Sequence, residues 1–468
     1  MKEEEPPVIL VKKSNQIQEV LMFKKHLQDK SKSGKSPSAT TFLLRQAEQY
    51  LQPLTADLDE QLDKRLVRTF YDLFMAIMSF RNRVLGLLLS ELGAFITGVK
   101  HAPAGTKGLS NLLRSKKWTH GSVEDFVMNR AALRSKEWVE GGQAPLFLWD
   151  DSVLEKPESW FSEGLCSVNS SKGKRRTKVK RGFYRPPSNR ICVPGYHWSA
   201  VLLSSLRQVP SLCLMRWWTT RGKHQDNADN VFYCMLRCVQ ERLGKLGVHI
   251  LDRGYASLKT LERFAKFQLQ LVVRWKSNLN LCRLPGGEAK KTHLLSRTAK
   301  PMQSRTVWDK ERKQSRRISI AYLPVHHAEV PELALTLLII RDKRHTQSPM
   351  YLLTNLPVNS LGMAWQVFFY YMHRWNIEQA FRFGKSELAM ESPRLWFFQN
   401  TLKLLSIVCL VYDFLLRLLT NWRSWAYALL NTWCPRTGER YRKASIPLYR
   451  LRSAIAACFA LFIAHNSG

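Results

Sequence analysis

The pattern of apolar and polar residues divides the chain into a helical first part, a middle of alternating strands and helices, and a helical end. From Thr41 to Arg130 apolar residues recur at helical spacing. After a Gly-Gly-Gln turn, short continuous apolar runs appear (PLFLW, VHIL, LQLVV), which are typical of buried strands. The segment from Asp229 to Gly247 between them has the spacing of an amphipathic helix. The pattern predicts an α/β fold preceded by a helical domain.

Two of the apolar strands are followed directly by aspartate. PLFLW is followed by Asp150 and Asp151, and VHIL is followed by Asp252. Strand pleating puts Asp150 and Asp151 on opposite sides, so we expect only one of them to face a shared site. Gly254 permits the sharp turn that a strand-end carboxylate needs. An Asp pair after a strand is also an ordinary turn or helix cap, and both interpretations stay open here.

The stretch YYMHRWNIEQAFRFGKSEL, residues 370–388, predicts one continuous helix. At roughly 100° per residue, one face of this helix carries a carboxylate, a phenol and three cations. These residues are Glu378, Tyr371, Arg374, Arg382 and Lys385. Ile377, Phe381 and Leu388 form a neighbouring apolar stripe that we expect to be buried. A Glu flanked by cations also fits a solvated ladder of salt bridges.

Charge indicates the class of partner. The chain has 72 Lys plus Arg against 37 Asp plus Glu, a formal net charge of +35, and 45% hydrophobic residues. A folded polycation favours a polyanion such as nucleic acid, because each neutralised phosphate releases counterions. A ribosomal or membrane-surface protein could carry a similar charge. The run KGKRRTKVKR, residues 172–181, predicts a loop that touches the DNA backbone.

The remaining composition favours a cytoplasmic protein. Nine cysteines are scattered without zinc-finger spacing, which indicates free thiols in a reducing compartment. The start MKEEEPP has no apolar core of a signal peptide, so we expect none. The longest apolar run, Leu402 to Leu419, is interrupted by charged residues and predicts a core helix, with no membrane span.

The spacing Tyr371-x2-Arg374-x3-Glu378-x6-Lys385 resembles the Tyr-Arg-Glu-Lys signature of one branch of the DDE transposases of bacterial insertion sequences. The resemblance implies an RNase H-like catalytic core of α/β class. It also implies a β-rich insertion between the second and third carboxylates, because 125 residues separate Asp252 from Glu378. The second motif of that family has the Asp-Arg-Gly-aromatic form that stands here at residues 252–255.

The resemblance assigns the catalytic carboxylates. It implies that Asp150, Asp252 and Glu378 are both catalytic residues and metal ligands. The Asp-x-Ser pattern favours Asp150 as the first of them, with Asp151 as the alternative. Three carboxylates suit Mg2+, which prefers oxygen ligands. Two ions about 3.5–4 Å apart can activate an attacking oxygen and stabilise a leaving one. The expected cofactor is therefore two Mg2+ ions, which Mn2+ can replace.

Eight side chains are expected to contact DNA. They are Tyr371, Arg374, Lys385, Arg253, Arg274, Lys276, Arg382 and Trp308. In LQLVVRWK the two cations share one face of a strand, which also fits an edge strand with solvated cations. The Trp would stack on a flipped or unpaired base, with core packing as the alternative. The expected partner is double-stranded DNA, both terminal inverted repeats and target DNA, bound by a homodimer close to the nucleoid.

The expected domains follow from these elements. They are a flexible lead at 1–40, a helical DNA-binding domain at 41–140, the RNase H-like core at 141–277 and 358–420, a β-rich insertion at 278–357, and a C-terminal helical segment at 421–468. The function expected is cut-and-paste transposition of an insertion sequence. The alternatives are a non-catalytic, transposase-derived DNA-binding regulator and a plain RNase H-type nuclease. The insertion and the cations around Glu378 disfavour the nuclease.

Overall fold

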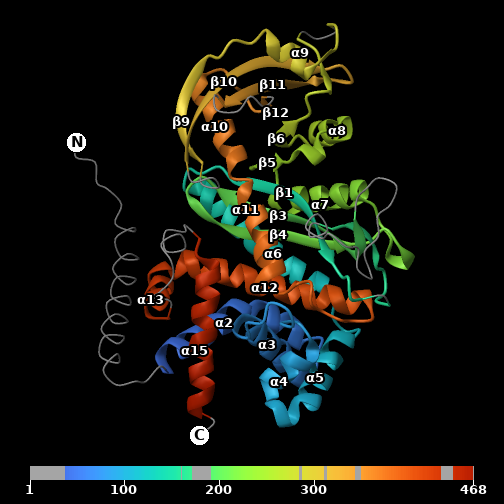
Figure 1. The fold of residues 1–468 in the computed structure, drawn as a ribbon, viewed down its shortest axis with the longest axis vertical. Helices are drawn as coiled ribbons and strands as arrows, with labels where there is room; N and C mark the ends of the chain where they lie inside the picture. Colours follow the sequence, from blue (N-terminus) through green and yellow to red (C-terminus); the bar gives the residue numbers. More distant parts are fainter. Residues whose placement is uncertain are drawn as a thin grey trace, which may run out of the picture. The chain divides into compact units, whose positions relative to one another are not determined.

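The computed structural model describes residues 37–159, 161–170, 191–283, 287–309, 314–342, 349–433 and 446–466. The basic run 172–181 and nearly all of the expected lead lie outside the described residues. The chain forms two compact units. Met1–Val123 and Phe383–Gly468 make up a helical unit, and Glu124–Arg382 make up a unit built on a β-sheet, here the sheet unit. The elements are labelled in Figure 1.

The helical unit is organised around a long apolar helix. Its helices are α2 (Pro37–Asp59), α3 (Lys64–Ser79), α4 (Leu89–Thr97), η1 (Val99–His101), α5 (Ala102–Arg114), α12 (Phe398–Asn421), α13 (Arg423–Trp433) and α15 (Leu448–Asn466). Nearly every residue of α12 is buried, as expected of a core helix. Its buried Asp413 accepts a 3.0 Å hydrogen bond from the Tyr50 hydroxyl. In the described residues no helix has the length and apolar character to cross a membrane.

The sheet unit contains a large mixed sheet, so the α/β class is correct. Strand order is β2-β3-β1-β5-β6-β12-β11-β10-β9, with β4 paired to β3. The strands are β1 (Leu146–Glu155), β2 (Cys166–Asn169), β3 (Cys192–Ser205), β4 (Gln208–Trp218), β5 (Val248–Leu251), β6 (Gln270–Trp275), β9 (Gln303–Asp309), β10 (Gln314–His327), β11 (Val330–Asp342) and β12 (Met350–Thr354). The pairs β1–β5 and β5–β6 are parallel. A small separate sheet pairs β7 (Asn280–Leu281) with β8 (Lys290–Lys291).

Helices pack against the sheet. They are α6 (His120–Glu140), α7 (Ala228–Leu243), α8 (Leu258–Phe267), α9 (Thr292–Arg297) and α10 (Leu361–Met372), with short turns η3 (Gly222–His224) and η4 (Arg253–Tyr255). Side chains of α7 and α8 join alternate residues of β1, β5 and β6 in one buried apolar cluster. Helix α10 contacts β5, β6 and β10 and lies on the other side of β5 and β6 from α8 in Figure 1. The predicted amphipathic helix at 229–247 corresponds to α7.

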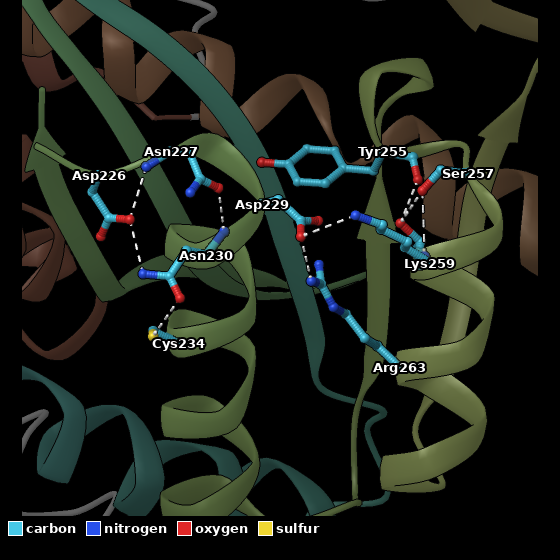
Figure 2. Close-up of polar contacts among 10 residues, drawn as sticks. Asp226, Asn227, Asp229, Asn230, Cys234, Tyr255, Ser257, Lys259 and Arg263 are labelled. Atoms are coloured by element: carbon cyan, nitrogen blue, oxygen red, sulfur yellow. Dashed lines mark hydrogen bonds and ion pairs between the residues drawn. The ribbon is translucent and has the colours of Figure 1, made fainter. Parts of the chain in front are cut away.

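Side chains fix the starts of α7 and α8 (Figure 2). Asn227 caps α7 by accepting a hydrogen bond from the amide of Asn230 at 2.9 Å. Ser257 caps α8 in the same way from the amide of Thr260, at 3.3 Å. Asp229 accepts a 2.9 Å charge-assisted bond from Arg263, which ties the two helices together. These contacts hold the segment after β5 in a defined position.

The strands after β6 belong to the same sheet. β12 pairs with β6 in antiparallel fashion, and β11, β10 and β9 follow in order. In the described part of the region from 278 to 357, strands β9 to β12 extend the sheet that carries the two aspartates, whereas β7 and β8 form the small separate sheet. The division of this unit into a core and an insertion therefore stays a prediction.

The first aspartates lie inside a strand, so the expectation that β1 ends at Asp150 is wrong. β1 continues to Glu155 because β3 supplies backbone partners along the acidic part, from Asp150 opposite Ala200 to Glu155 opposite Gly195. The parallel pairing of β1 with β5 does stop at Trp149 and Leu251. Asp150 and Asp252 thus come directly after the last residues through which β1 and β5 pair with each other.

Candidate active site

The predicted single helix over residues 370–388 is wrong in one respect. Helix α10 ends at Met372, and helix α11 (Trp375–Ser386) begins after a two-residue turn. Backbone bonds here span three residues, as in a 3₁₀-helix: the amide of Arg374 donates to the carbonyl of Tyr371 at 3.0 Å, and the amide of Ile377 to that of Arg374 at 3.1 Å. Arg374 therefore lies at the junction of two helices, not on the face of one.

Three carboxylates converge on the guanidinium of Arg374. Its Nη1 donates to Oδ2 of Asp150 at 3.0 Å, and its Nε lies 3.7 Å from Oδ1 of Asp252. Its Nη2 contacts Oε1 of Glu378, in the first turn of α11. These acids come from β1, from the end of β5 and from α11, which are far apart in the sequence. The structure therefore gathers the three predicted carboxylates around one cation.

Tyr371 completes the cluster. Its hydroxyl donates to Oδ1 of Asp252 at 3.2 Å, and its ring centroid lies 5.9 Å from the Arg374 guanidinium carbon. Burial, together with the charge of Asp252, raises the pKa of Tyr371 to about 12, against the opposing charge of Arg374. The phenol is thus protonated at neutral pH and acts as a donor.

The acids of the cluster are electrostatically crowded. Burial raises the pKa of Asp150 to about 7, and the charges of Asp252 and Glu378 add to this, although Arg374 opposes it. Burial by itself would lower the pKa of Arg374, but its electrostatic interactions with Tyr371 and with the three carboxylates raise it above its ordinary value. Arg374 is therefore a permanent cation in a group of acids that repel one another.

Asp151 points to a different set of partners. Its Oδ1 accepts a 2.5 Å hydrogen bond from the Ser199 hydroxyl, and its Oδ2 accepts a 2.8 Å bond from the Tyr255 hydroxyl. Asp150, one residue earlier, contacts Arg374. This is the separation that pleating predicts. Sequence reasoning missed Ser199 and Tyr255, although the aromatic residue three positions after Asp252 was a signal for the second of them.

Three predicted cations lie on and after β5 and β6. Arg274 is half-buried on β6, and its charge opposes the rise in the pKa of Tyr371, so it acts close to the cluster. Lys276 follows the strand, and its Nζ donates to the carbonyl of Ala256 at 3.1 Å. Arg253 is exposed in η4. The charge of Arg274 thus acts on Tyr371, a member of the cluster.

The other predicted DNA contacts are Arg382, Lys385 and Trp308. Arg382 is exposed, with its guanidinium 5.4 Å from the ring centroid of Trp375. Lys385 lies in the last turn of α11 and belongs to the helical unit, about 10 Å along the helix from Glu378 at about 1.5 Å per residue. Trp308, on strand β9 at the end of the sheet, is 57% exposed, which excludes core packing as its role.

The acids fit a divalent metal in kind. Asp150, Asp252 and Glu378 offer only carboxylate oxygens, which Mg2+ prefers. Among the described residues, however, no three His, Cys, Asp or Glu side chains stand close enough together to hold an ion as they are. In this arrangement the guanidinium of Arg374 lies among the carboxylates. The three carboxylates are thus ligands of the kind that Mg2+ prefers. In this arrangement they surround the guanidinium of Arg374 and are too far apart to hold an ion.

Comparison with known proteins gives similarities to solved structures and to a family model. One solved structure, a cryo-EM structure of a piggyBac transposase synaptic complex with hairpin DNA, has a TM-score of 0.42 and 11% identity, over 86% of this chain and 73% of that chain. The comparison with curated proteins gave no match. Residues 225–414 match the family model described as "Transposase DDE domain". The matched segment includes Asp252, Arg374 and Glu378, whereas Asp150 precedes it.

Proposed function

We propose that the chain is a DNA transposase whose site for cutting and joining DNA is formed by Asp150, Asp252 and Glu378. The observation that carries this proposal is the convergence of the three acids, from three separate elements, on one cation. The match of residues 225–414 to a transposase family supports it. The strand order β4-β3-β1-β5-β6, with an antiparallel meander followed by two parallel strands, supports an RNase H-like core.

The finer assignment rests on the spacing of Tyr371, Arg374, Glu378 and Lys385. This spacing supports the Tyr-Arg-Glu-Lys branch found in bacterial insertion sequences, and hence cut-and-paste transposition in the cytoplasm, close to the nucleoid. The expected domain boundaries and a homodimer on terminal-repeat DNA are part of the proposal. The net charge of +35 supports a DNA partner.

The side chains have distinct tasks in this mechanism. Asp150, Asp252 and Glu378 would hold Mg2+, which when bound supplies activation of an attacking oxygen and stabilisation of a leaving one. Tyr371 orients Asp252 through its donated hydrogen bond. Arg374 neutralises the carboxylates in the free protein, and its planar guanidinium is suited to pair with a DNA phosphate. The same site would thus accept water as the attacking group in strand cleavage and a 3′-hydroxyl as the attacking group in strand transfer.

The remaining DNA contacts are proposed from charge and exposure. Arg253, Arg274, Lys276, Arg382 and Lys385 would hold phosphates. Trp308 would stack on an unpaired base, since its exposed ring stands on strand β9 opposite Ser315. These contacts would position the duplex, whereas the acids would act at the scissile phosphate.

The test uses a duplex that carries the terminal repeats, found as inverted repeats in the DNA flanking the gene. We expect Mg2+-dependent cleavage by the wild-type chain, and a loss of about 100-fold or more for Asp252→Asn and Glu378→Gln. Glu241→Gln, on the exposed face of α7, is the matched control and should cleave normally. Affinity for the duplex should remain in all variants. Wild-type chain that binds the repeats without cutting them would support the non-catalytic regulator.

A further inference from the structure

The two strands that carry the site aspartates lose their direct pairing just before them. β1 and β5 pair from Leu146 opposite Val248 to Trp149 opposite Leu251. Asp150 and Asp252 are the next residues, and the β1–β5 register does not extend to them. Asp150 remains paired with β3 on its other side, so contacts outside the β1–β5 pairing, including those of Arg374, bear on the distance between the two aspartates.

The Tyr255 hydroxyl makes such a contact. It donates to Oδ2 of Asp151 at 2.8 Å, whereas the amide of Tyr255 donates to the carbonyl of Asp252 at 3.1 Å. The carbonyl of Tyr255 accepts a 2.6 Å bond from the Thr260 hydroxyl at the start of α8. A chain of short contacts therefore runs from Asp252 through Tyr255 to Asp151, which is joined by one peptide bond to Asp150.

Packing limits the freedom of the Tyr255 ring. Its centroid lies 4.9 Å from that of Phe232 on α7, and Phe232 in turn packs edge-on against Trp149, the last residue of β1 that pairs with β5, at 5.2 Å. Figure 2 shows the ring between the N-terminal ends of α7 and α8, which are themselves joined by Asp229 and Arg263. The hydroxyl is thus held at a fixed place beside the carboxyl-terminal part of β1.

Asp151 is also held from the side of β3. Its Oδ1 accepts from Ser199, the residue opposite it on β3, at 2.5 Å. The indole of Trp218 donates to the Ser199 hydroxyl at 3.0 Å, and the ring of His197 stacks on Trp218 at 4.1 Å. With each oxygen of Asp151 engaged, pleating directs Asp150 to the opposite face, where it meets Arg374.

We propose that Tyr255 is a positioning residue for the site, which acts on Asp150 through Asp151. Its hydroxyl fixes the end of β1 against the turn after β5, so that Asp150 and Asp252 keep one separation. The inference rests on the proposed function, because that function gives the separation a chemical role. Outer contacts that orient metal-binding carboxylates have effects of this kind.

Tyr255→Phe is the test, because it removes the hydroxyl and keeps the ring that packs on Phe232. In the full chain we expect the single-turnover cleavage rate on terminal-repeat duplex, and the affinity for Mn2+ measured without DNA by electron paramagnetic resonance, each to fall about 10-fold or more. The dissociation constant for the duplex should stay within about twofold, since phosphate contacts dominate it. Tyr233→Phe, which removes a hydroxyl from a neighbouring tyrosine of α7, is the control and should change neither quantity.

Two further variants test whether Tyr255 acts through Asp151. If Tyr255 acts through Asp151, then Asp151→Ala and the double variant with Tyr255→Phe should cleave at nearly the same rate, because the contact is already lost in the single variant. If the double variant instead loses the product of the two single losses in cleavage rate, the two residues act independently, and the proposal is overturned. A Tyr255→Phe protein that melts earlier but keeps wild-type cleavage and Mn2+ affinity would overturn it as well. Wild-type chain that fails to cut terminal-repeat DNA would instead overturn the proposed function, whatever the tyrosine variant does.

Discussion

The guanidinium of Arg374 donates to the carboxylate of Asp150 at 3.0 Å, which links a helix junction to a strand 224 residues earlier in the sequence. The same group contacts Asp252 and Glu378. In the protein without metal or DNA, Arg374 is therefore the counter-ion of three carboxylates. A divalent ion that binds those acids must compete with it, which leads to the first prediction.

Arg374→Gln should strengthen the binding of Mn2+ to the DNA-free chain. The variant removes the positive charge that competes for the carboxylates and leaves them to repel one another, so we expect affinity to rise by about tenfold, roughly 1.4 kcal/mol. Mn2+ should also raise the melting temperature of this variant more than that of the wild type. Weaker Mn2+ binding by Arg374→Gln, measured by titration calorimetry, would show that the guanidinium supports the metal site.

Asp150→Ala and Asp151→Ala should differ in stability. Asp151 accepts hydrogen bonds from Ser199 and Tyr255, so its loss leaves two hydroxyls without this partner and should lower the free energy of unfolding by roughly 1–2 kcal/mol. Asp150 is a crowded acid with a pKa raised to about 7, mainly by burial, so its removal should change stability less. Urea unfolding of both variants checks this. A larger loss for Asp150→Ala would contradict the roles assigned to the pair.

His249 should make the fold sensitive to mild acid. This residue of β5 is fully buried, accepts a 3.0 Å bond from the Trp149 indole, and has its pKa lowered to about 3 by burial. In the unfolded chain the imidazole of His249 binds a proton below about pH 6.5, whereas in the folded chain it does not. Stability should therefore fall as pH drops from about 6.5 towards 3, with this residue contributing up to about 1.4 kcal/mol per pH unit.

The measurement for His249 is the slope of unfolding free energy against pH for the wild type and His249→Gln. The variant should show a slope shallower by about one proton in this window. His101→Gln, at an exposed position of the helical unit, is the control and should follow the wild type. Parallel slopes for wild type and His249→Gln would refute the assignment.

Trp308→Ala should affect DNA more than the fold. The side chain is 57% exposed on strand β9, so its loss should change the free energy of unfolding by no more than about 0.5 kcal/mol. Loss of one stacked base should weaken binding to a duplex with an unpaired terminal base by about 1–3 kcal/mol. Trp396→Ala, at a tryptophan that is 63% exposed in the helical unit, is the matched control. Equal affinity of the two variants would remove the stacking role.

Local sequence patterns predicted the elements that bury continuous apolar surface. α12 and α7 follow from helical spacing, and β5 from an apolar run that ends at Asp252. Local patterns could not show that β1 continues through Asp150, because its acidic part is held by backbone bonds to β3, about 50 residues later. The break at Arg374 and the contact of Tyr255 with Asp151 likewise depend on tertiary partners.

The central claim is that three acids form one site, and their combined substitution tests it most directly. Asp150→Asn, Asp252→Asn, Glu378→Gln and the triple variant would be compared by single-turnover cleavage of terminal-repeat duplex in Mg2+. Groups that act as a unit are not additive, so each single variant should lose about 100-fold or more and the triple variant should lose little beyond that. Duplex affinity should be kept or increased, because negative charge is removed. Near wild-type cleavage by any one of the three single variants would contradict the account.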